Sequence, residues 1–372
     1  MNIRGLTENI GMVSEPRRPW GNIRHKLEDI LIIGLCTIIC GGEDFVDMEE
    51  FGRERKDWLS KFLELPNEIP DSDTFRRVLE RVNPAELSLW LNDWLKTESQ
   101  AGGRLVNIDG KTIRGSKNHK HSAFHVVSAW VGENSITLGE LAVDERSNEI
   151  TAVPKLLDLL DIKGDIVTAD AMSCQKDIAR TIIEKEADYV LALKGNQPAM
   201  ENEVKKYFSW LEHDKPRKEP FEVWSSPPEK DHGRLEIREV TVIPAAWYVH
   251  KDDWKNLQSF IQVRSSVTQK DVETVSCRYY ISSLRVSACR FSEIIRGHWS
   301  IENNLHWCLD TAFGEDSARA RKDNSPLNLN VMRKLSLSLL KLSYMGKRVS
   351  LKKKMFKAAL NQDRLLAVLA QK

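Results

Sequence analysis

The sequence predicts an α/β fold, with a mixed sheet and flanking helices, preceded by a small all-α domain. Three observations predict it. The first hundred residues carry apolar stripes at helical spacing, broken by proline and asparagine. From Arg104 the pattern changes to short segments in the order β-β-β-α-β-α-β-α. Strand-like segments alone then follow from about 213 to 290, which predicts a β-rich insertion.

The N-terminal helices are expected over 22–40, 46–63 and 72–82. Asn83-Pro84 begins a fourth helix, which extends to about Thr97, because proline suits the first helical turn. The apolar run from Ile30 to Cys40 is too short to span a bilayer and long for a strand, so we expect a buried helix. Residues 100–103 contain two glycines and are expected to form a linker.

The alternating region is expected to form strands at 104–109, 124–131, 135–143, 165–170 and 188–194, with helices at 148–160, 174–186 and 198–211. Pro154 suits a kink or a late start of the first of these helices. This order is that of the ribonuclease-H-like fold, in which the first and fourth strands are neighbours. Asp109 and Asp170 would then lie side by side, although 61 positions separate them.

Later segments complete the predicted organisation. Strands are expected at 222–224, 234–243, 257–267 and 274–284, before a helix that carries Glu302. From Phe291 to the end the chain is expected to be mainly helical. We therefore predict a helical domain over 1–99, a catalytic domain over 104–345 with the insertion at about 213–290, and a basic helical tail over 346–372.

Composition is that of a soluble globular protein, with 41% hydrophobic and 29% charged residues. The N-terminus lacks the layout of a signal peptide and no apolar run has membrane length, so we expect a cytoplasmic protein without a membrane partner. The six cysteines are scattered, with no second close pair to complete a zinc site, and are expected to be reduced.

The net charge of +1 hides an asymmetry. Residues 331–372 hold 11 Lys and Arg against one acid, Asp363, which predicts polyanion binding; the alternative is a solvated helix. Residues 1–99 hold 13 Lys and Arg against 19 acids. This acidic domain is expected to pack on the catalytic core or to pair protomers, or else to read DNA through Arg76, Arg77 and Arg81.

Three carboxylates lie in settings that suggest chemistry. Asp109 and Asp170 each end an apolar strand, where an unpaired carboxylate is costly to desolvate. Glu302 lies at helical spacing between His298 and His306, which predicts one shared face, although a lone helical Glu is usually a surface residue. Such oxygen ligands suit hard divalent cations, two of which can promote phosphoryl transfer on a polynucleotide.

Five motifs agree in order and spacing with one known family. They are NIDGKTIRGS at 107–116, TADAM at 168–172, LKGNQP at 193–198, RGHWSIENNLHW at 296–307 and FGEDSARARKDN at 313–324. Over nearly its whole length the chain resembles the H-repeat-associated insertion-sequence transposases of Rhs elements. The resemblance implies a ribonuclease-H-like DDE transposase that uses two Mg²⁺ or Mn²⁺ ions. By position, Asp109, Asp170 and Glu302 are its catalytic and metal-binding residues.

The wider group of DDE transposases with such insertions often carries Tyr, Arg and Lys around the catalytic Glu. This chain has Ile295, His298 and Leu309 in those places. The phosphate clamp is therefore expected from Arg296, from His298, or from Arg319 with Arg321.

Further DNA contacts are expected on two loops. Lys111 and Arg114 follow Asp109, where a cation can reach a phosphate, although a solvated loop charge is an equal alternative. Lys194, Asn196 and Gln197 end the fifth strand, at the edge where ligands of such sheets gather.

The function expected from these features is DNA transposition: cleavage at element ends and strand transfer into target DNA. The partner is double-stranded DNA, bound by a homodimer in a nucleoid-associated cytoplasmic complex. Two alternatives remain open. A metal-dependent nuclease of the same fold would cut DNA without joining it, and a catalytically inactive relic would only bind DNA.

Overall fold

The computed structural model of the chain describes residues 10–18, 23–95, 102–118, 122–143, 148–214, 221–231, 233–270 and 272–370. Its contacts divide the chain into two compact units. Unit 1 comprises Met1–Gln100, Gly110–Arg146 and Ile301–Lys372, and unit 2 comprises Ala101–Asp109 and Ser147–Ser300. Strand β1 (Leu105–Thr112) passes from unit 2 into unit 1. The domain boundaries expected near 99, 104 and 345 remain predictions.

Unit 1 is mainly helical, as expected for its N-terminal and C-terminal parts. Its helices are η1 (Ile10–Met12), α2 (Leu27–Ile39), α3 (Phe45–Glu54), α4 (Lys56–Leu59), α5 (Ser72–Leu79), α6 (Pro84–Leu95), η3 (Arg114–Ser116), the π-helix η6 (Ile301–His306), α11 (Trp307–Thr311), η7 (Glu315–Ser317), α12 (Ser325–Leu342), α13 (Leu351–Leu360) and α14 (Gln362–Leu369). Strands β2 (His125–Val131) and β3 (Ile136–Ala142) form an antiparallel hairpin. The expected end of α6 at Thr97 lies outside the described residues.

Helix α2 is the buried helix that the sequence predicted. Almost all of its residues are buried, and it packs against α3 and α12. Ile33 and Leu35 of α2 share one hydrophobic core with Phe75 of α5 and Leu335 of α12. Each such fully buried side chain contributes roughly 1.5–3 kcal/mol to folding. The N-terminal helices therefore fold onto the C-terminal helix α12, which supports the packing role expected for them.

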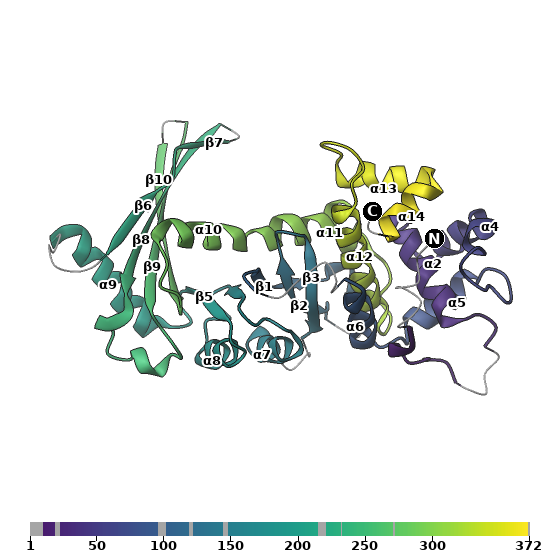
Figure 1. Cartoon of the computed structure of the whole chain (residues 1–372), viewed down its shortest axis with the longest axis horizontal. Helices are drawn as coiled ribbons and strands as arrows, with labels where there is room; N and C mark the ends of the chain where they lie inside the picture. The colour runs from purple at the N-terminus through teal and green to yellow at the C-terminus, as the bar shows by residue number, and fades with distance from the viewer. Residues whose placement is uncertain are drawn as a thin grey trace. The chain divides into compact units, whose positions relative to one another are not determined.

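Unit 2 is built on a large mixed sheet (Figure 1). Besides β1, its strands are β4 (Ile166–Ala169), β5 (Asp188–Leu193), β6 (Glu222–Ser225), β7 (Glu229–Asp231), β8 (Arg234–Pro244), β9 (Ser259–Gln269) and β10 (Val272–Ser282). Their order is β1-β4-β5-β10-β9-β8-β6, and β7 pairs with β8. The pairs β1–β4 and β4–β5 are parallel, and the remaining pairs are antiparallel.

The register of β1 and β4 confirms the expected neighbourhood of the first and fourth strands. The pairing runs from Leu105 opposite Ile166 to Ile108 opposite Ala169. Asp109 and Asp170 are the next residues after this paired stretch. Asp170 directly follows β4, but the expectation that the first strand ends at Asp109 is wrong, because β1 continues to Thr112. The β-rich insertion extends this same sheet, because β10 pairs with β5.

Helices cover both faces of the sheet in unit 2 (Figure 1). Helix α10 (Ala288–His298) packs through Phe291 and Ile294 on Val190 of β5. Side chains alternate along a strand, so Tyr189 and Leu191 point to the opposite face, where α7 (Glu149–Leu159) and α8 (Lys176–Glu184) lie. Helix α9 (Pro198–Asp214) packs Phe208 against Tyr279 of β10.

Helix α7 differs from one expectation. Pro154 neither delays its start nor ends it, because the helix begins at Glu149, capped by the Asn148 side chain, and continues through Pro154. Pro154 is the sixth residue of the helix, so the missing N–H removes the one intrahelical bond that would reach the Ile150 carbonyl. Among the described residues, no helix has the length and apolarity needed to cross a membrane.

Candidate active site on β1 and β4

In unit 2, Asp109 and Asp170 lie one residue beyond the last paired residues of the adjacent parallel strands β1 and β4. Strand β4 ends at Ala169, whereas β1 continues past Asp109. Both side chains are partly exposed. An oxygen of Asp170 accepts a hydrogen bond from the Ser173 backbone N–H at 3.1 Å. Desolvation raises the pKa of Asp170, and the negative charge of Glu149 raises it further. The sequence did not reveal this effect of Glu149, because acidic residues are common in the first turn of a helix.

The loop that follows Asp170 is braced by residues expected to touch DNA. The Asn196 side-chain amide donates to the carbonyl of Ala171 and, at 3.3 Å, to that of Cys174. The Gln197 amide donates to the Cys174 carbonyl at 3.1 Å. These amides are engaged in shaping the loop. Lys194, three residues before Gln197, is exposed and remains available for a phosphate.

Four polar side chains link α10 to the two strands. Thr168 Oγ1 on β4 donates to Asn107 Oδ1 on β1 at 2.7 Å and lies 2.8 Å from His298 Nδ1. The Asn107 amide donates to Ser300 Oγ at 3.2 Å. Asn107 and Thr168 are buried polar residues inside apolar strands, which is the sequence signal that could have revealed them.

His298 is therefore part of an internal network, where the sequence suggested a phosphate contact. The ring keeps some surface exposure, but its close surroundings desolvate it and lower its pKa to about 4. A histidine with this pKa is neutral near pH 7 and offers a phosphate no positive charge.

Glu302 lies in unit 1, on the π-helix η6, and its side chain is exposed. The buried Ile301 and Leu305 anchor this π-helix in the core of unit 1. We expected His298, Glu302 and His306 to share one face of a single α-helix, and this is wrong. Helix α10 ends at His298, and the π-helix that follows has i→i+5 bonds, so residues four apart no longer stack.

Lys111, on the part of β1 in unit 1, is held by three carboxylates. Its Nζ lies 2.7 Å from Asp310, 3.3 Å from Glu315 and 3.5 Å from Asp316. The amine is largely buried, so contact with a phosphate requires these ion pairs to open. Arg114 is exposed and reaches Asp316 only at 3.9 Å.

The other cations expected to bind DNA differ in their availability. Both guanidinium NH groups of Arg296 bond Glu229 of β7. Arg321 is exposed but donates its Nε–H to the Gly115 carbonyl at 3.1 Å. A Cβ on Gly115 would lie 2.7 Å from the carbonyl oxygens of Glu315 and Ala318, so only glycine allows this close approach. Arg319 is exposed.

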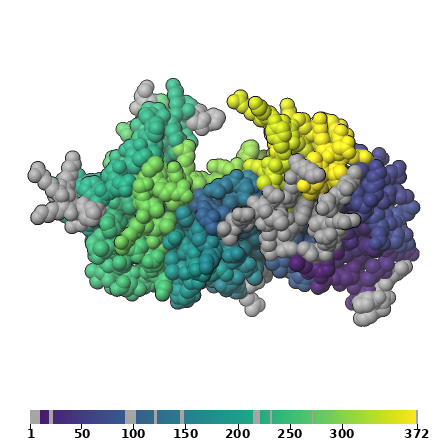
Figure 2. Space-filling view, viewed as in Figure 1, coloured from purple at the N-terminus to yellow at the C-terminus, as the bar shows by residue number. Residues whose placement is uncertain are grey.

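The basic C-terminal region is only partly a free surface, which corrects the expectation for residues 331–372. Arg333 and Lys334 are buried, and Lys334 pairs with Glu140. The Lys354 amine donates to the carbonyls of Leu340 and Ser343, both at 2.7 Å. Within the described part of this region, up to residue 370, the exposed cations are Lys347, Arg348, Lys352, Lys353 and Arg364. Figure 2 shows the last helices, in yellow, at the surface of the molecule.

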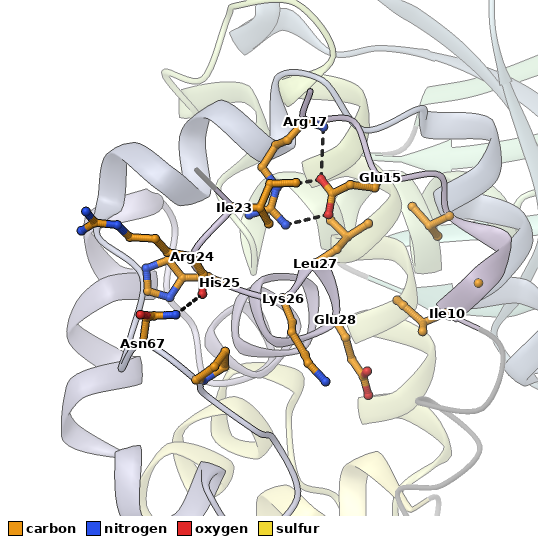
Figure 3. A pocket seen from close by; sticks show the side chains of 13 residues that line it. Ile10, Glu15, Arg17, Ile23, Arg24, His25, Lys26, Leu27, Glu28 and Asn67 are labelled. Carbon is orange, nitrogen blue, oxygen red and sulfur yellow. Dashed lines mark hydrogen bonds and ion pairs between the residues drawn. The ribbon is translucent and has the colours of Figure 1, made fainter. Parts of the chain in front are cut away.

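A surface hollow of about 540 Å³ lies in the N-terminal part of unit 1 (Figure 3). Its lining includes Ile10 and Leu27, together with the polar pair Glu15 and Arg17. Arg17 Nη2 donates to Glu15 at 2.7 Å across this hollow, so this guanidinium is already neutralised. Arg17 is therefore not the free cation that a phosphate site would use at this point.

The residues that fit divalent metal ions are the paired aspartates. In the part of the chain that the structure describes, no three His, Cys, Asp or Glu side chains are gathered as metal ligands. Asp109 and Asp170 nevertheless offer hard oxygen donors directly after the paired stretch of two adjacent parallel strands. A nearby cation would offset the desolvation and acidic neighbour that raise the pKa of Asp170.

Comparison with known proteins gives matches over nearly the whole chain. Residues 7–95 match the family model described as DDE_Tnp_1-associated, and residues 100–339 match the model described as Transposase DDE domain. A protein of Escherichia coli O157:H7 named "Putative transposase YncI" is 37% identical over 385 residues, which cover 100% of this chain and 95% of the relative. A protein of Escherichia coli K12 named "H repeat-associated putative transposase YhhI" is 36% identical over 379 residues, covering 100% and 99%.

Proposed function

Because the chain belongs to the transposase DDE domain family, we propose that it is a DNA transposase. It cleaves phosphodiester bonds at the ends of an insertion element and joins the freed ends to target DNA. The observation that carries this proposal is the parallel pairing of β1 with β4, whose paired stretch ends at Ile108 and Ala169, directly before Asp109 and Asp170.

The proposed metal ligands are Asp109, Asp170 and Glu302, which hold two Mg²⁺ or Mn²⁺ ions. When bound, such a pair of ions stabilises charge on the attacking and leaving oxygens of an in-line displacement. The protein supplies the frame. Strands β1 and β4 fix the two aspartates, and the Ser173 N–H orients one oxygen of Asp170. Glu302, on the π-helix η6, is proposed as the third ligand because of its position in the RGHWSIENNLHW motif.

The ribonuclease-H-like architecture belongs to the same proposal. The parallel order β1-β4-β5 with helices on both faces supports it. Double-stranded DNA is the proposed partner, bound by a homodimer assembled on the element ends, in a nucleoid-associated cytoplasmic complex. The exposed Lys194, Arg114 and Arg319 are the cations best placed for phosphates, because fewer internal bonds engage them.

The test is incubation of the purified protein with Mg²⁺ and DNA that carries the repeats flanking its own gene. We expect nicks at the repeat ends and joined products with a target duplex. Asp109→Asn and Asp170→Asn should abolish both, while the DNA dissociation constant and thermal unfolding change little. Asp177→Asn, a change on the exposed face of α8, is the matched control and should act like the wild type.

Other results would select the alternatives. Cutting without any joined product would identify a nuclease. Repeat binding without any cutting, in Mg²⁺ and in Mn²⁺, would identify an inactive DNA-binding protein. Loss of folding in Asp109→Asn would mean that the carboxylate is structural.

A further inference from the structure

We propose that His298 is a positioning residue, whose neutral imidazole fastens the end of α10 to β1 and β4 just before the two aspartates. This inference rests on the proposed function for its effect on catalysis. It replaces the phosphate-binding role that the position of His298 in the sequence suggests.

The hydrogen bonds fix the proton on the imidazole ring. A threonine hydroxyl carries a single proton, and that of Thr168 is donated to Asn107 Oδ1 at 2.7 Å. Thr168 Oγ1 can therefore only accept from His298, 2.8 Å away. His298 must carry its proton on Nδ1, and Nε2 is left without one.

The hydrogen-bonded side chains of this network lie on the same two strands as the aspartates, on the N-terminal side of each. Asn107 precedes Asp109 by two residues, and Thr168 precedes Asp170 by two residues. Residues two apart on a strand point to the same face, so His298 binds the face that carries the aspartates. Displacing its ring would therefore disturb the Thr168–Asn107 pair that lies directly before both aspartates.

The backbone of α10 is shaped for this approach. Gly297, beside His298, packs directly on the Leu105 side chain at the start of β1, where an added Cβ would overlap it. Ser300, two residues beyond His298, receives the Asn107 amide. The helix end thus contacts β1 at two levels and β4 at one.

The environment of His298 keeps the ring uncharged. Desolvation holds its pKa near 4, so the imidazole is neutral at the pH of any cleavage assay. Protonation would leave Nδ1–H unchanged and place a second proton on Nε2 in these close surroundings. Residues that orient metal-binding side chains typically change activity by roughly 10–100-fold when they are removed.

The first experiment reads the ring itself. In protein with ¹⁵N-labelled histidine, His298 should show a protonated Nδ1 and a bare Nε2 from pH 5.5 to 8, without titration. Assignment comes from the His298→Asn spectrum. Thr168→Val removes the acceptor at nearly constant volume and should abolish this tautomer preference, whereas Thr168→Ser should keep it. A ring that titrates near pH 6.5, or carries its proton on Nε2, would overturn the proposal.

The second experiment reads the reaction. His298→Asn keeps an N–H near the place of Nδ1 and should retain cleavage within about threefold, whereas His298→Phe and Thr168→Val should lose roughly 10–100-fold in the cleavage rate. DNA affinity and its salt slope should stay unchanged. A phosphate contact predicts the reverse: weaker binding in both His298 variants and rescue by His298→Arg. Wild-type cleavage by Thr168→Val would also refute the role, and the ring measurement decides the network even if no DNA is cut.

Discussion

The ion cluster around Glu315 gives a prediction that the structure allows us to size. The perturbation is Glu315→Gln, which removes one charge and little volume. Glu315 is 0% exposed and lies 3.3 Å from the Lys111 amine and 3.9 Å from the guanidinium of the buried Arg333. Glu315 Oε2 faces Lys111, whereas Oε1 faces Arg333 and also accepts from the Asn330 amide at 2.7 Å, a bond that glutamine can keep.

The cost follows from Arg333. At an effective dielectric constant of about 20, a charge pair at 3.9 Å attracts by about 4 kcal/mol. This attraction offsets the desolvation of Arg333, which already lowers the pKa of its guanidinium. Breaking such a buried pair typically costs about 3–5 kcal/mol, because the other charge is left uncompensated. With glutamine retaining the Asn330 bond, we expect about 3 kcal/mol.

The assay is thermal unfolding at pH 7, where about 3 kcal/mol corresponds to a fall in Tm of roughly 4 °C for a chain of 372 residues that unfolds cooperatively. Asp316→Asn is the matched control, since this carboxylate is in the same cluster, 3.5 Å from Lys111, but 33% exposed. Its loss should cost less than about 1 kcal/mol. Equal falls in Tm for the two variants, or none for Glu315→Gln, would refute the reasoning that burial of Arg333 sets the cost.

Two further predictions follow from other parts of unit 1. Replacing the exposed Lys347, Arg348, Lys352 and Lys353 by Gln should flatten the log–log salt dependence of DNA binding by about 0.9 for each phosphate that is no longer neutralised. Lys354→Gln is the control and should leave this slope unchanged, because the Lys354 amine is already bonded to backbone carbonyls. An unchanged slope in the fourfold variant as well would mean that DNA binds elsewhere. Asp71→Ala should cost roughly 0.5–2 kcal/mol at pH 7, because the carboxylate caps α5 by accepting from Thr74 N–H at 2.7 Å, and Asp71→Asn should keep the cap. These bonds lower the pKa of Asp71, so its ionised form adds stability above pH 3.8 that is lost as the pH falls through the folded-state pKa. Urea titrations should therefore show that the loss of stability in Asp71→Ala becomes smaller at low pH. A loss that stays constant with pH would contradict this.

The chain's local signals predicted most elements and the neighbourhood of the first two carboxylates. The strand that carries Asp109 and the strand that leads to Asp170 are readable from short apolar runs, and the β-β-β-α-β order predicts that they pair in parallel. The end of the first strand was not predicted, because β1 continues past Asp109 to Thr112. The helix beginning at Pro84 and the buried helix over Ile30–Ile39 follow equally from capping and periodicity.

Individual side-chain roles did not follow from the sequence. In the sequence, Lys111, Arg296 and His298 look alike as cations beside a candidate catalytic carboxylate, yet the first two are ion-paired and the third is neutral. Their states depend on Glu315, Glu229 and Thr168, which lie far away in the chain. A charge is read from one position, but its pKa and its partner are set by whatever the fold packs against it.

The sequence by itself therefore determined the family, the alternation of strands and helices, and the identity of the candidate carboxylates, because each rests on residue types and spacings within short segments. Only the tertiary structure decided which polar side chains are engaged in internal hydrogen bonds or ion pairs. Three features came from the tertiary structure alone. They are the register of β1 on β4, the π-helix at Ile301–His306 that follows α10, and the burial of Arg333 and Lys334. Each depends on contacts between segments dozens to hundreds of residues apart, and side-chain hydrogen bonds over such distances leave no periodic trace in a single chain.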